Sequence, residues 1–272
     1  MKIDAHQHFW HYDPEKYSWI NDEKIQKDFL PEDLKPMLKD ANFEGTILVQ
    51  AQQTEEETQF LLKLAAENNL IKGVIGWVDL NSEEIEASLA RFSKNKLLKG
   101  VRHTVYDEKG EFMTDPAFQS GVSKLAIFGL VYEILVFPYQ LPGAIALAEK
   151  FPEQKFVLDH LAKPDVTKAP STQWKQEIQK LAGNKNVFCK ISGLLSEAGK
   201  DWNPSDFSPF LDVVVHCFGI ERLMFGSDWP VSLSGGSYSE SVKIIEDYFS
   251  TNSEEDLKKV MGGTACDFYN IS

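Results

Sequence analysis

The sequence predicts a single (β/α)8 barrel, or TIM barrel, on three observations. The chain has 272 residues, about the length of one such barrel. Eight short β-rich runs recur along it, and most begin about 30 residues after the last, the length of one βαβ unit. Amphipathic stretches with helical spacing fill the intervals. Strands that alternate with helices form a parallel sheet, and eight such units close naturally into a barrel.

The expected strands are short runs rich in residues that favour extended backbone. They lie at 2–6, 45–51, 72–78, 99–105, 128–135, 155–160, 186–192 and 222–228.

Helices are expected in the intervals. Residues 31–42 open with Pro-Glu-Asp, which suits a first turn near the positive end of the helix dipole. Thr54 and Glu57 form a capping box for the next helix, and Asp115 caps another before Pro116. The remaining helices are expected at 81–95, 204–218 and 238–249.

The largest insertion lies between the first two strands. Residues 11–30 are rich in Trp and Tyr, and we expect them to form a rim loop or lid. Neither a low-complexity linker nor a repeat beyond the βα rhythm divides the chain. We therefore expect one domain over residues 1–272.

Composition narrows the class of protein. A formal net charge of −13 disfavours nucleic-acid partners, because phosphate binding needs a basic face. The three cysteines, Cys189, Cys217 and Cys266, are odd in number and lack CxxC spacing, which indicates free thiols in a reducing compartment. No signal peptide precedes the first expected strand, and no apolar run reaches the roughly 18 residues of a membrane span. We expect a cytoplasmic protein without a membrane partner.

The first strand ends in two histidines. The active site of a βα barrel sits at the C-terminal ends of its strands. Because side chains alternate along a strand, His6 and His8 are expected to share a face with Asp4, away from Ile3 and Ala5. The two imidazoles can then converge on one metal ion or one substrate oxygen. The alternative is a pair of polar residues at a strand exit.

The sixth and eighth strands also end in residues that carry chemistry. His160 is expected on the face of Phe156 and Leu158, and Asp228 on the face of Met224. Each closes an otherwise apolar strand. A hydrogen-bonded rim histidine and a helix N-cap aspartate are the structural alternatives.

Two further strands end in polar residues whose roles stay open. His103 closes the fourth strand, and Lys190 lies late in the seventh. For both, a catalytic or binding role and a structural role are equally favoured. Arg102 is expected to point away from His103 and to pair with a helix carboxylate.

Four segments together resemble the lactonase branch of the amidohydrolase superfamily, which includes L-fuconolactonases and L-rhamnonolactonases. They are IDAHQHFW at 3–10, LDHLAKP at 158–164, CKISGL at 189–194 and RLMFGSDWPV at 222–231. They occur in the expected order, each at an expected strand, and cover nearly the whole chain. The resemblance implies a TIM barrel in which His160 and Asp228 complete a site with His6 and His8.

The resemblance also bears on the metal. It implies one divalent ion, with zinc the first choice, held by His6, His8 and Asp228. Metal-dependent relatives usually carry a further histidine at the fifth strand or a bridging lysine at the fourth, and here the fifth strand offers only Glu133. Since some relatives work without metal, we expect the ion to be loosely bound or dispensable.

The implied reaction is hydrolysis of a lactone. Asp228 acts as the base that deprotonates water, and His6 and His8 polarise the carbonyl oxygen. His103 or His160 protonates the departing oxygen. The chain lacks a GxSxG elbow, which disfavours a serine hydrolase. The alternatives are a metal-dependent decarboxylase of the same superfamily and a sugar-binding barrel without catalysis.

The substrate expectation rests on scarce arginine. The chain has 3 arginines and 28 − 3 = 25 lysines, whereas carboxylated lactones are usually bound by the planar fork of Arg. We expect a neutral sugar-acid lactone instead. Its expected contacts, which could equally be core residues in the case of the tryptophans, are Gln50, Trp77, Lys190, Trp202 and Trp229. The oligomeric state stays open, a homo-oligomer included.

Overall fold

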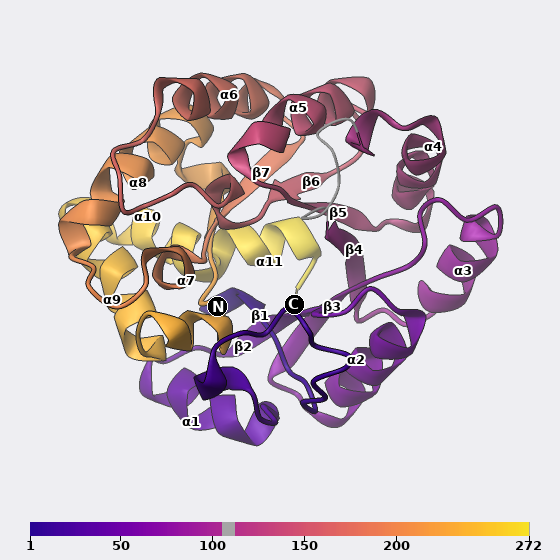
Figure 1. The fold of residues 1–272 in the computed structure, drawn as a ribbon, viewed down its shortest axis with the longest axis horizontal. Coiled ribbons are helices and arrows are strands. Elements are labelled where there is room, and N and C mark those ends of the chain that lie inside the picture. The colour runs from indigo at the N-terminus through magenta and orange to yellow at the C-terminus, as the bar shows by residue number, and fades with distance from the viewer. Residues whose placement is uncertain (105–111, 272) are drawn as a thin grey trace.

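Eight parallel strands form one sheet whose order follows the sequence from β1 to β8. The computed structural model describes residues 1–104 and 112–271, so Val105, the last residue of the expected fourth strand, lies outside the described residues. Helices alternate with the strands and surround them, as Figure 1 shows. The expected (β/α)8 barrel is confirmed.

Most strands are shorter than the sequence runs suggested. They are β1 Ile3–Gln7, β2 Gly45–Val49, β3 Ile71–Gly76, β4 Leu98–Thr104, β5 Val131–Leu135, β6 Phe156–Leu158, β7 Val187–Ile191 and β8 Leu223–Phe225. Because β6 and β8 end early, His160 and Asp228 lie in the loops that follow these strands.

The α-helices occupy the expected intervals and the C-terminal segment. They are α1 Pro31–Asp40, α2 Glu55–Glu67, α3 Ile85–Phe92, α4 Pro116–Leu125, α5 Leu141–Lys150, α6 Thr172–Gly183, α7 Leu194–Ala198, α8 Pro204–Phe218, α9 Tyr238–Tyr248, α10 Glu254–Lys258 and α11 Thr264–Tyr269. No helix among residues 1–104 and 112–271 has the length and apolar content to cross a membrane.

Two helix starts confirm the predicted caps, with one difference. Thr54 accepts a hydrogen bond from the backbone N–H of Glu57, and Asp115 caps α4. The carboxylate of Glu57 does not close a capping box with Thr54. It reaches further back and accepts hydrogen bonds from the backbone N–H groups of Ala51 and Gln52.

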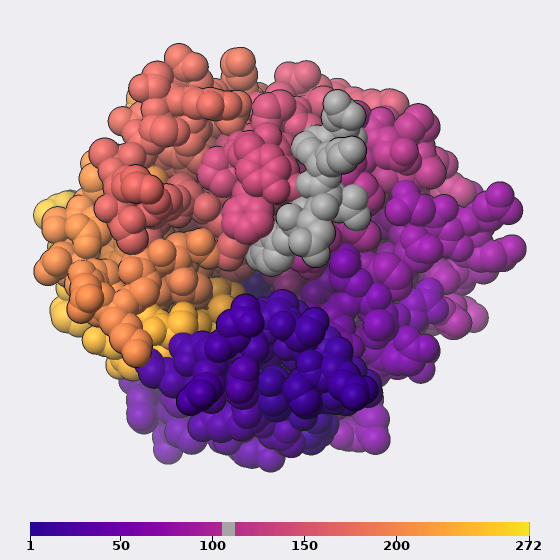
Figure 2. Space-filling view, viewed as in Figure 1, coloured from indigo at the N-terminus to yellow at the C-terminus, as the bar shows by residue number. Residues whose placement is uncertain are grey.

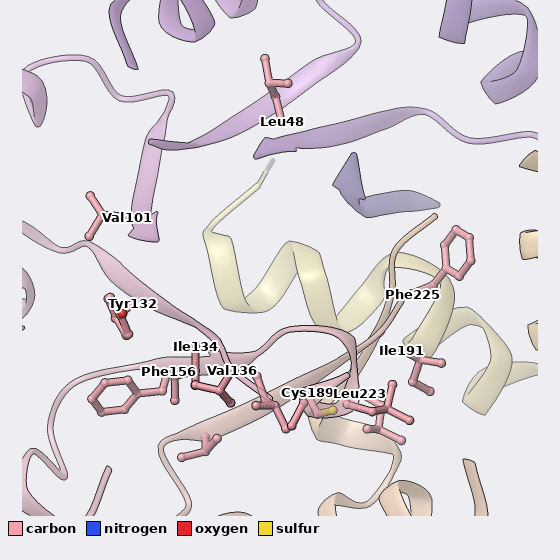
Figure 3. Packing of buried hydrophobic residues seen from close by; sticks show 14 of the residues in the cluster. Leu48, Val101, Tyr132, Ile134, Val136, Phe156, Cys189, Ile191, Leu223 and Phe225 are labelled. Carbon is pink, nitrogen blue, oxygen red and sulfur yellow. The ribbon is translucent and has the colours of Figure 1, made fainter. Parts of the chain in front are cut away.

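Strand residues alternate between two apolar cores. The larger core lies between strands and helices and holds outward-facing side chains such as Val101, Tyr132 and Cys189, labelled in Figure 3. The smaller core fills the inside of the barrel, where Val157 and Met224 pack with residues of α11. Figure 1 shows this helix crossing behind the middle of the strands, so it closes the N-terminal end of the barrel.

Alternation along β5 shows how polar groups enter the barrel. Val131 belongs to the inner core, whereas Tyr132 and Ile134 belong to the outer one. Glu133, between them, therefore points inward, one layer nearer the C-terminal ends of the strands. The layer above the inner core is polar, and it forms the floor of the site described next.

Candidate active site

A bulge in β1 decides where its histidines lie. The pairing of β1 with β2 shifts register after Asp4. Ile3 and Ala5 belong to the inner core, while the Asp4 carboxylate accepts hydrogen bonds from the backbone N–H of His6 (3.2 Å) and of Ser227 (2.9 Å). The expectation that Asp4 shares a face with His6 is wrong, because the extra residue of the bulge rotates the strand.

Backbone hydrogen bonds between the ends of β1 and β8 bring the histidines to the aspartate. The N–H of Asp228 donates to the carbonyl of His6 (2.8 Å), and the N–H of His8 donates to the carbonyl of Trp229 (2.8 Å). Gly226 permits this approach, since a Cβ on it would lie 2.5 Å from the Cβ of His6.

His6, His8 and Asp228 form one buried group whose ligand atoms all lie within 4.8 Å of one another. Oδ1 of Asp228 lies 3.4 Å from Nε2 of His8 and 3.8 Å from Nε2 of His6. Nδ1 of His8 is 2.8 Å from the carbonyl of Val49, so Nδ1 carries the proton and Nε2 offers its lone pair to the site. Two imidazoles and a carboxylate are a donor set that suits zinc or a similar divalent ion.

His160 reaches the same carboxylate through an unusual turn. Residues 160–163 all have positive φ, between 49° and 63°, which is rare for residues other than glycine. This turn directs His160 inward, with Nε2 3.9 Å from Oδ1 of Asp228. Phe156 and Leu158 lie in the outer core, so the expectation that His160 shares their face is wrong. Such strain concentrates at functional sites, where the surrounding structure holds it.

Two neighbours fix the ring of His160. Its Nδ1 lies 2.9 Å from the hydroxyl of Ser192. Gly193 packs directly against the imidazole, and a Cβ there would lie 2.7 Å from Nδ1. Gly193 also has φ of +70°, so both its conformation and its lack of a side chain are required.

The protonation states follow from burial and neighbouring charge. Burial by itself raises the pKa of Asp228, but the neighbouring imidazoles of His160, His8 and His6 outweigh burial and hold this pKa below its usual range. Burial lowers the pKa of His160 to about 4 and that of His6 well below its usual value. At neutral pH the site therefore presents an ionised Asp228 beside neutral His6 and His160.

A cavity of about 820 Å³ opens above this group. His8, His160 and Asp228 line its inner part together with Gln50 and Arg102. Residues 18–22, from the expected rim loop, line its outer part. Figure 2 shows this face of the molecule, with the indigo N-terminal segment bordering the hollow at its centre. A smaller cavity of about 480 Å³ lies at the opposite end of the barrel, lined by Lys96, Lys99 and Lys155 among others.

The loop that follows β2 contributes Ala51–Thr54 to the cavity wall and is held by Glu57.

Burial raises the pKa of Glu57 to about 7 from 4.5, so the folded protein retains a proton that the unfolded chain releases between these values. We expect this group to lower the free energy of unfolding by about 3 kcal/mol as pH rises from 4.5 to 7. Urea unfolding of Glu57→Gln and of the unchanged protein at several pH values measures this effect. The difference between their free energies of unfolding should change by about 3 kcal/mol from pH 4.5 to pH 7. A difference that stays constant with pH would contradict the prediction.

A buried charged network lies beneath the cavity floor. The ammonium of Lys190 is 2.6 Å from Glu133 and 3.3 Å from Asp159. The hydroxyl of Tyr269, on α11, donates to the other oxygen of Glu133 (2.5 Å). Arg102 donates to Asp159 (3.0 Å), and the four charged residues are at most 4% exposed. Burial raises the pKa of Glu133 to about 7, whereas Lys190, His6 and Arg102 outweigh burial at Asp159 and hold its pKa well below the usual range.

The structure brings some of the expected substrate contacts to the cavity and places others elsewhere. Gln50 lines it. Lys190 is fully buried in the network below. His103 faces outward from β4, where it accepts a hydrogen bond from Nε1 of Trp77 (3.3 Å) and stacks on Phe112. Burial lowers the pKa of His103 to about 4.

The other tryptophans named from the sequence pack within the protein. Trp229 is fully buried and packs edge-on against Phe9 and Phe29. Trp202 donates its indole N–H to the carbonyl of Gly235. The tryptophan that lines the cavity is Trp19 of the rim loop, which is 40% exposed.

Sequence reasoning missed Asp159 and Ser196 and misjudged Arg102. Ser196 donates a hydrogen bond to Oδ2 of Asp228 (2.7 Å). Arg102 pairs with Asp159 across the barrel, and not with a helix carboxylate. The alternation of side chains along a strand could have identified Asp159. It lies two residues after Val157, which faces the inside of the barrel, so Asp159 is expected to face inward as well.

Comparisons with known proteins agree with this geometry. The family model described as Amidohydrolase matches residues 3–271. An L-fucono-1,5-lactonase of Burkholderia ambifaria is 35% identical over 278 residues, which cover 100% of this chain and 96% of that protein. An L-fucono-1,5-lactonase of Burkholderia multivorans is 36% identical over 288 residues, with the same coverage.

A solved structure with bound zinc is similar over its whole length. It is the crystal structure of an amidohydrolase from Burkholderia multivorans, with a TM-score of 0.95 and 35% identity, and the match covers 100% of both chains. The zinc in this relative and the group formed by His6, His8 and Asp228 together support a divalent metal, zinc among the candidates.

Proposed function

The chain belongs to the amidohydrolase family, and from this premise we propose that it is a lactonase that hydrolyses a neutral sugar-acid lactone. The observation that carries the proposal is the ionised carboxylate of Asp228, buried at the inner end of the cavity among three imidazoles. The two L-fucono-1,5-lactonase relatives support the choice of substrate class.

The chemistry assigns the base role to Asp228. Its Oδ1 takes a proton from a water molecule, whose oxygen attacks the lactone carbonyl carbon. Ser196 donates to Oδ2 and thereby fixes the carboxylate. No residue of the chain forms a covalent bond with the substrate in this scheme.

The histidines act on the two oxygens of the reacting ester. His8 and His160 line the cavity beside Asp228. A ring N–H of His160 is suited to hold the carbonyl oxygen as it gains negative charge, whereas Nε2 of His8 offers a lone pair and would act on that oxygen through a bound ion. The carbon–oxygen bond of the ring then breaks, and the departing oxygen takes up a proton to become a hydroxyl. We assign this transfer to His160, which lies 3.9 Å from Oδ1 of Asp228 and relays to the departing oxygen the proton that Asp228 took from water; His103 faces away from the cavity.

The metal has a defined place in this scheme. His6, His8 and Asp228 would hold it, and a divalent ion there supplies a Lewis acid that polarises the carbonyl group. Asp228 and His160 keep their roles in this scheme whether or not the ion is bound.

A decarboxylase is less well supported. That chemistry needs a cation free to clamp a carboxylate, typically Arg. The guanidinium of Arg102 is already bonded to Asp159 and to the carbonyl of Gln50.

The test is a pH-indicator assay of the purified protein on a panel of sugar-acid lactones, since hydrolysis releases an acid. Turnover of at least one lactone at a rate well above spontaneous hydrolysis is expected. Absence of turnover on the whole panel, with or without added zinc, would contradict the proposal.

Substrate preference gives a second prediction. Among the described residues, the cavity wall carries the cations Arg102, Lys16 and Lys163 and the anions Asp22, Glu197 and Asp228, so this part of the wall has no excess of positive charge. Lys163 forms an ion pair with Glu197, and Arg102 with Asp159. We expect kcat/KM for L-fucono- and L-rhamnono-lactones to exceed that for muconolactone and pyrone dicarboxylate by at least about tenfold. A tenfold preference for a carboxylated lactone would overturn this prediction.

Metal removal gives a third prediction. The site has two imidazoles and one carboxylate for the ion but no histidine from β5, where Glu133 is tied to Lys190. We expect less than one equivalent of metal after purification and at most partial loss of activity in chelator. Elemental analysis and a chelator titration of the assay measure both. One tightly held equivalent with complete inactivation by chelator would show the prediction to be wrong.

A further inference from the structure

Both ring nitrogens of His6 face charged groups. Nδ1 lies 3.2 Å from the ammonium of Lys190 and 3.5 Å from Oδ1 of Asp159. Nε2 lies 3.2 Å from a guanidinium nitrogen of Arg102 and 3.8 Å from Oδ1 of Asp228. The ring is fully buried, so these side chains decide what each nitrogen does.

The neighbours of Nδ1 select one tautomer. A neutral imidazole has one N–H and one lone pair. The ammonium of Lys190 is paired with Glu133 and Asp159, whereas Oδ1 of Asp159 receives no hydrogen bond in the described residues. A proton on Nδ1 gives this buried oxygen a donor, so we assign the proton to Nδ1 and the lone pair to Nε2.

That lone pair has a partner within the protein. Arg102 cannot lose its proton, and its NH1 group is at hydrogen-bond distance from Nε2 of His6. Nε2 is also the atom through which His6 joins the metal-binding group with His8 and Asp228. An ion bound there and the hydrogen bond from Arg102 use the same pair of electrons.

We infer that Arg102 competes with the metal ion for Nε2 of His6 and so sets the metal affinity of the site. Competition acts in two ways, through the shared lone pair and through repulsion between two positive charges in a buried setting. The guanidinium keeps other partners when it yields Nε2, because NH1 also donates to Asp159 and NH2 to the carbonyl of Gln50. Metal binding therefore requires a small rearrangement and no loss of the network.

The test measures zinc binding directly. Wild-type protein, Arg102→Gln and Arg102→Lys are stripped of metal, and their zinc affinities are compared by competition with a chromophoric chelator. We expect Arg102→Gln to bind zinc at least about tenfold more tightly than the unchanged protein, with Arg102→Lys between the two because it keeps a charge without the planar fork. Circular dichroism and thermal unfolding establish that each variant is folded.

Two controls separate this inference from charge in general and from the catalytic proposal. Lys16→Gln removes one positive charge from an exposed residue that lines the same cavity, and it should leave zinc affinity unchanged. Asp228→Asn should weaken zinc binding, because it removes a ligand. Equal or weaker zinc binding by folded Arg102→Gln would overturn the inference, as would unchanged binding by Asp228→Asn. If Arg102→Gln does not fold, Arg102→Lys must bind more tightly than wild type, or the inference fails. The readout is zinc binding and not turnover, so the result stands apart from whether the protein is a lactonase.

Discussion

Replacing Asp228 with Asn is expected to lower kcat by about 10²-fold or more while the protein stays folded. The amide cannot take a proton from water. Among the described residues at the inner end of the cavity, where His8 and His160 surround Asp228, no second carboxylate is present to replace it as the base. The substitution keeps the size of the side chain, and Ser196 can still donate to its oxygen. Steady-state kinetics on the best lactone of the panel measure the loss.

A matched control is Asp22→Asn. Asp22 lies on the same cavity wall but in the rim, where it caps a short 3-10 helix by accepting from the backbone N–H of Lys24. Asn also caps helices well, so kcat should stay close to that of the unchanged protein. A folded Asp228→Asn variant with near-normal kcat would exclude Asp228 as the base.

Replacing Lys190 with Met is expected to have the largest effect on stability, lowering the free energy of unfolding by about 3 to 5 kcal/mol. The ammonium is fully buried and neutralises Glu133 and Asp159 at once. Without it, two carboxylates remain in the barrel with less compensating charge. Chemical unfolding at constant pH measures the change.

The double variant Lys190→Met/Glu133→Leu should recover much of this loss, since removing both members of a buried pair is often close to neutral. Lys243→Met is the matched surface control. Lys243 pairs with Asp247 at 2.8 Å, but both side chains are more than half exposed, so this change should cost less than about 1 kcal/mol. If Lys190→Met costs no more than Lys243→Met, the buried network does not stabilise the fold as described.

The sequence alone determined the architecture and the chemical character of the site. Eight β-rich runs at regular intervals specify a parallel barrel, because strand and helix periodicity are local properties. Polar residues at strand ends then fall at one end of the barrel, as His8, His160 and Asp228 do.

The tertiary structure decided which side each side chain takes. The bulge in β1 separates Asp4 from His6, and the left-handed turn at 160–163 sends His160 inward. Neither feature has a local signature, since the surrounding packing and not the residue type supports a backbone conformation that is unfavourable in isolation.

The packing of the whole barrel also explains why three side chains lie in other surroundings than the sequence predicted. Barrel closure sets the phase of β4, so Arg102 enters the site and His103 packs outside against Trp77. Lys190 points inward as its position suggested, but two carboxylates from β5 and the end of β6 bind it below the cavity. Sequence shows which residues can carry charge, and only the closed barrel brings together partners that lie 184 residues apart, such as His6 and Lys190. Burial then makes pairing obligatory, because an unpaired charge inside the barrel is too costly to keep.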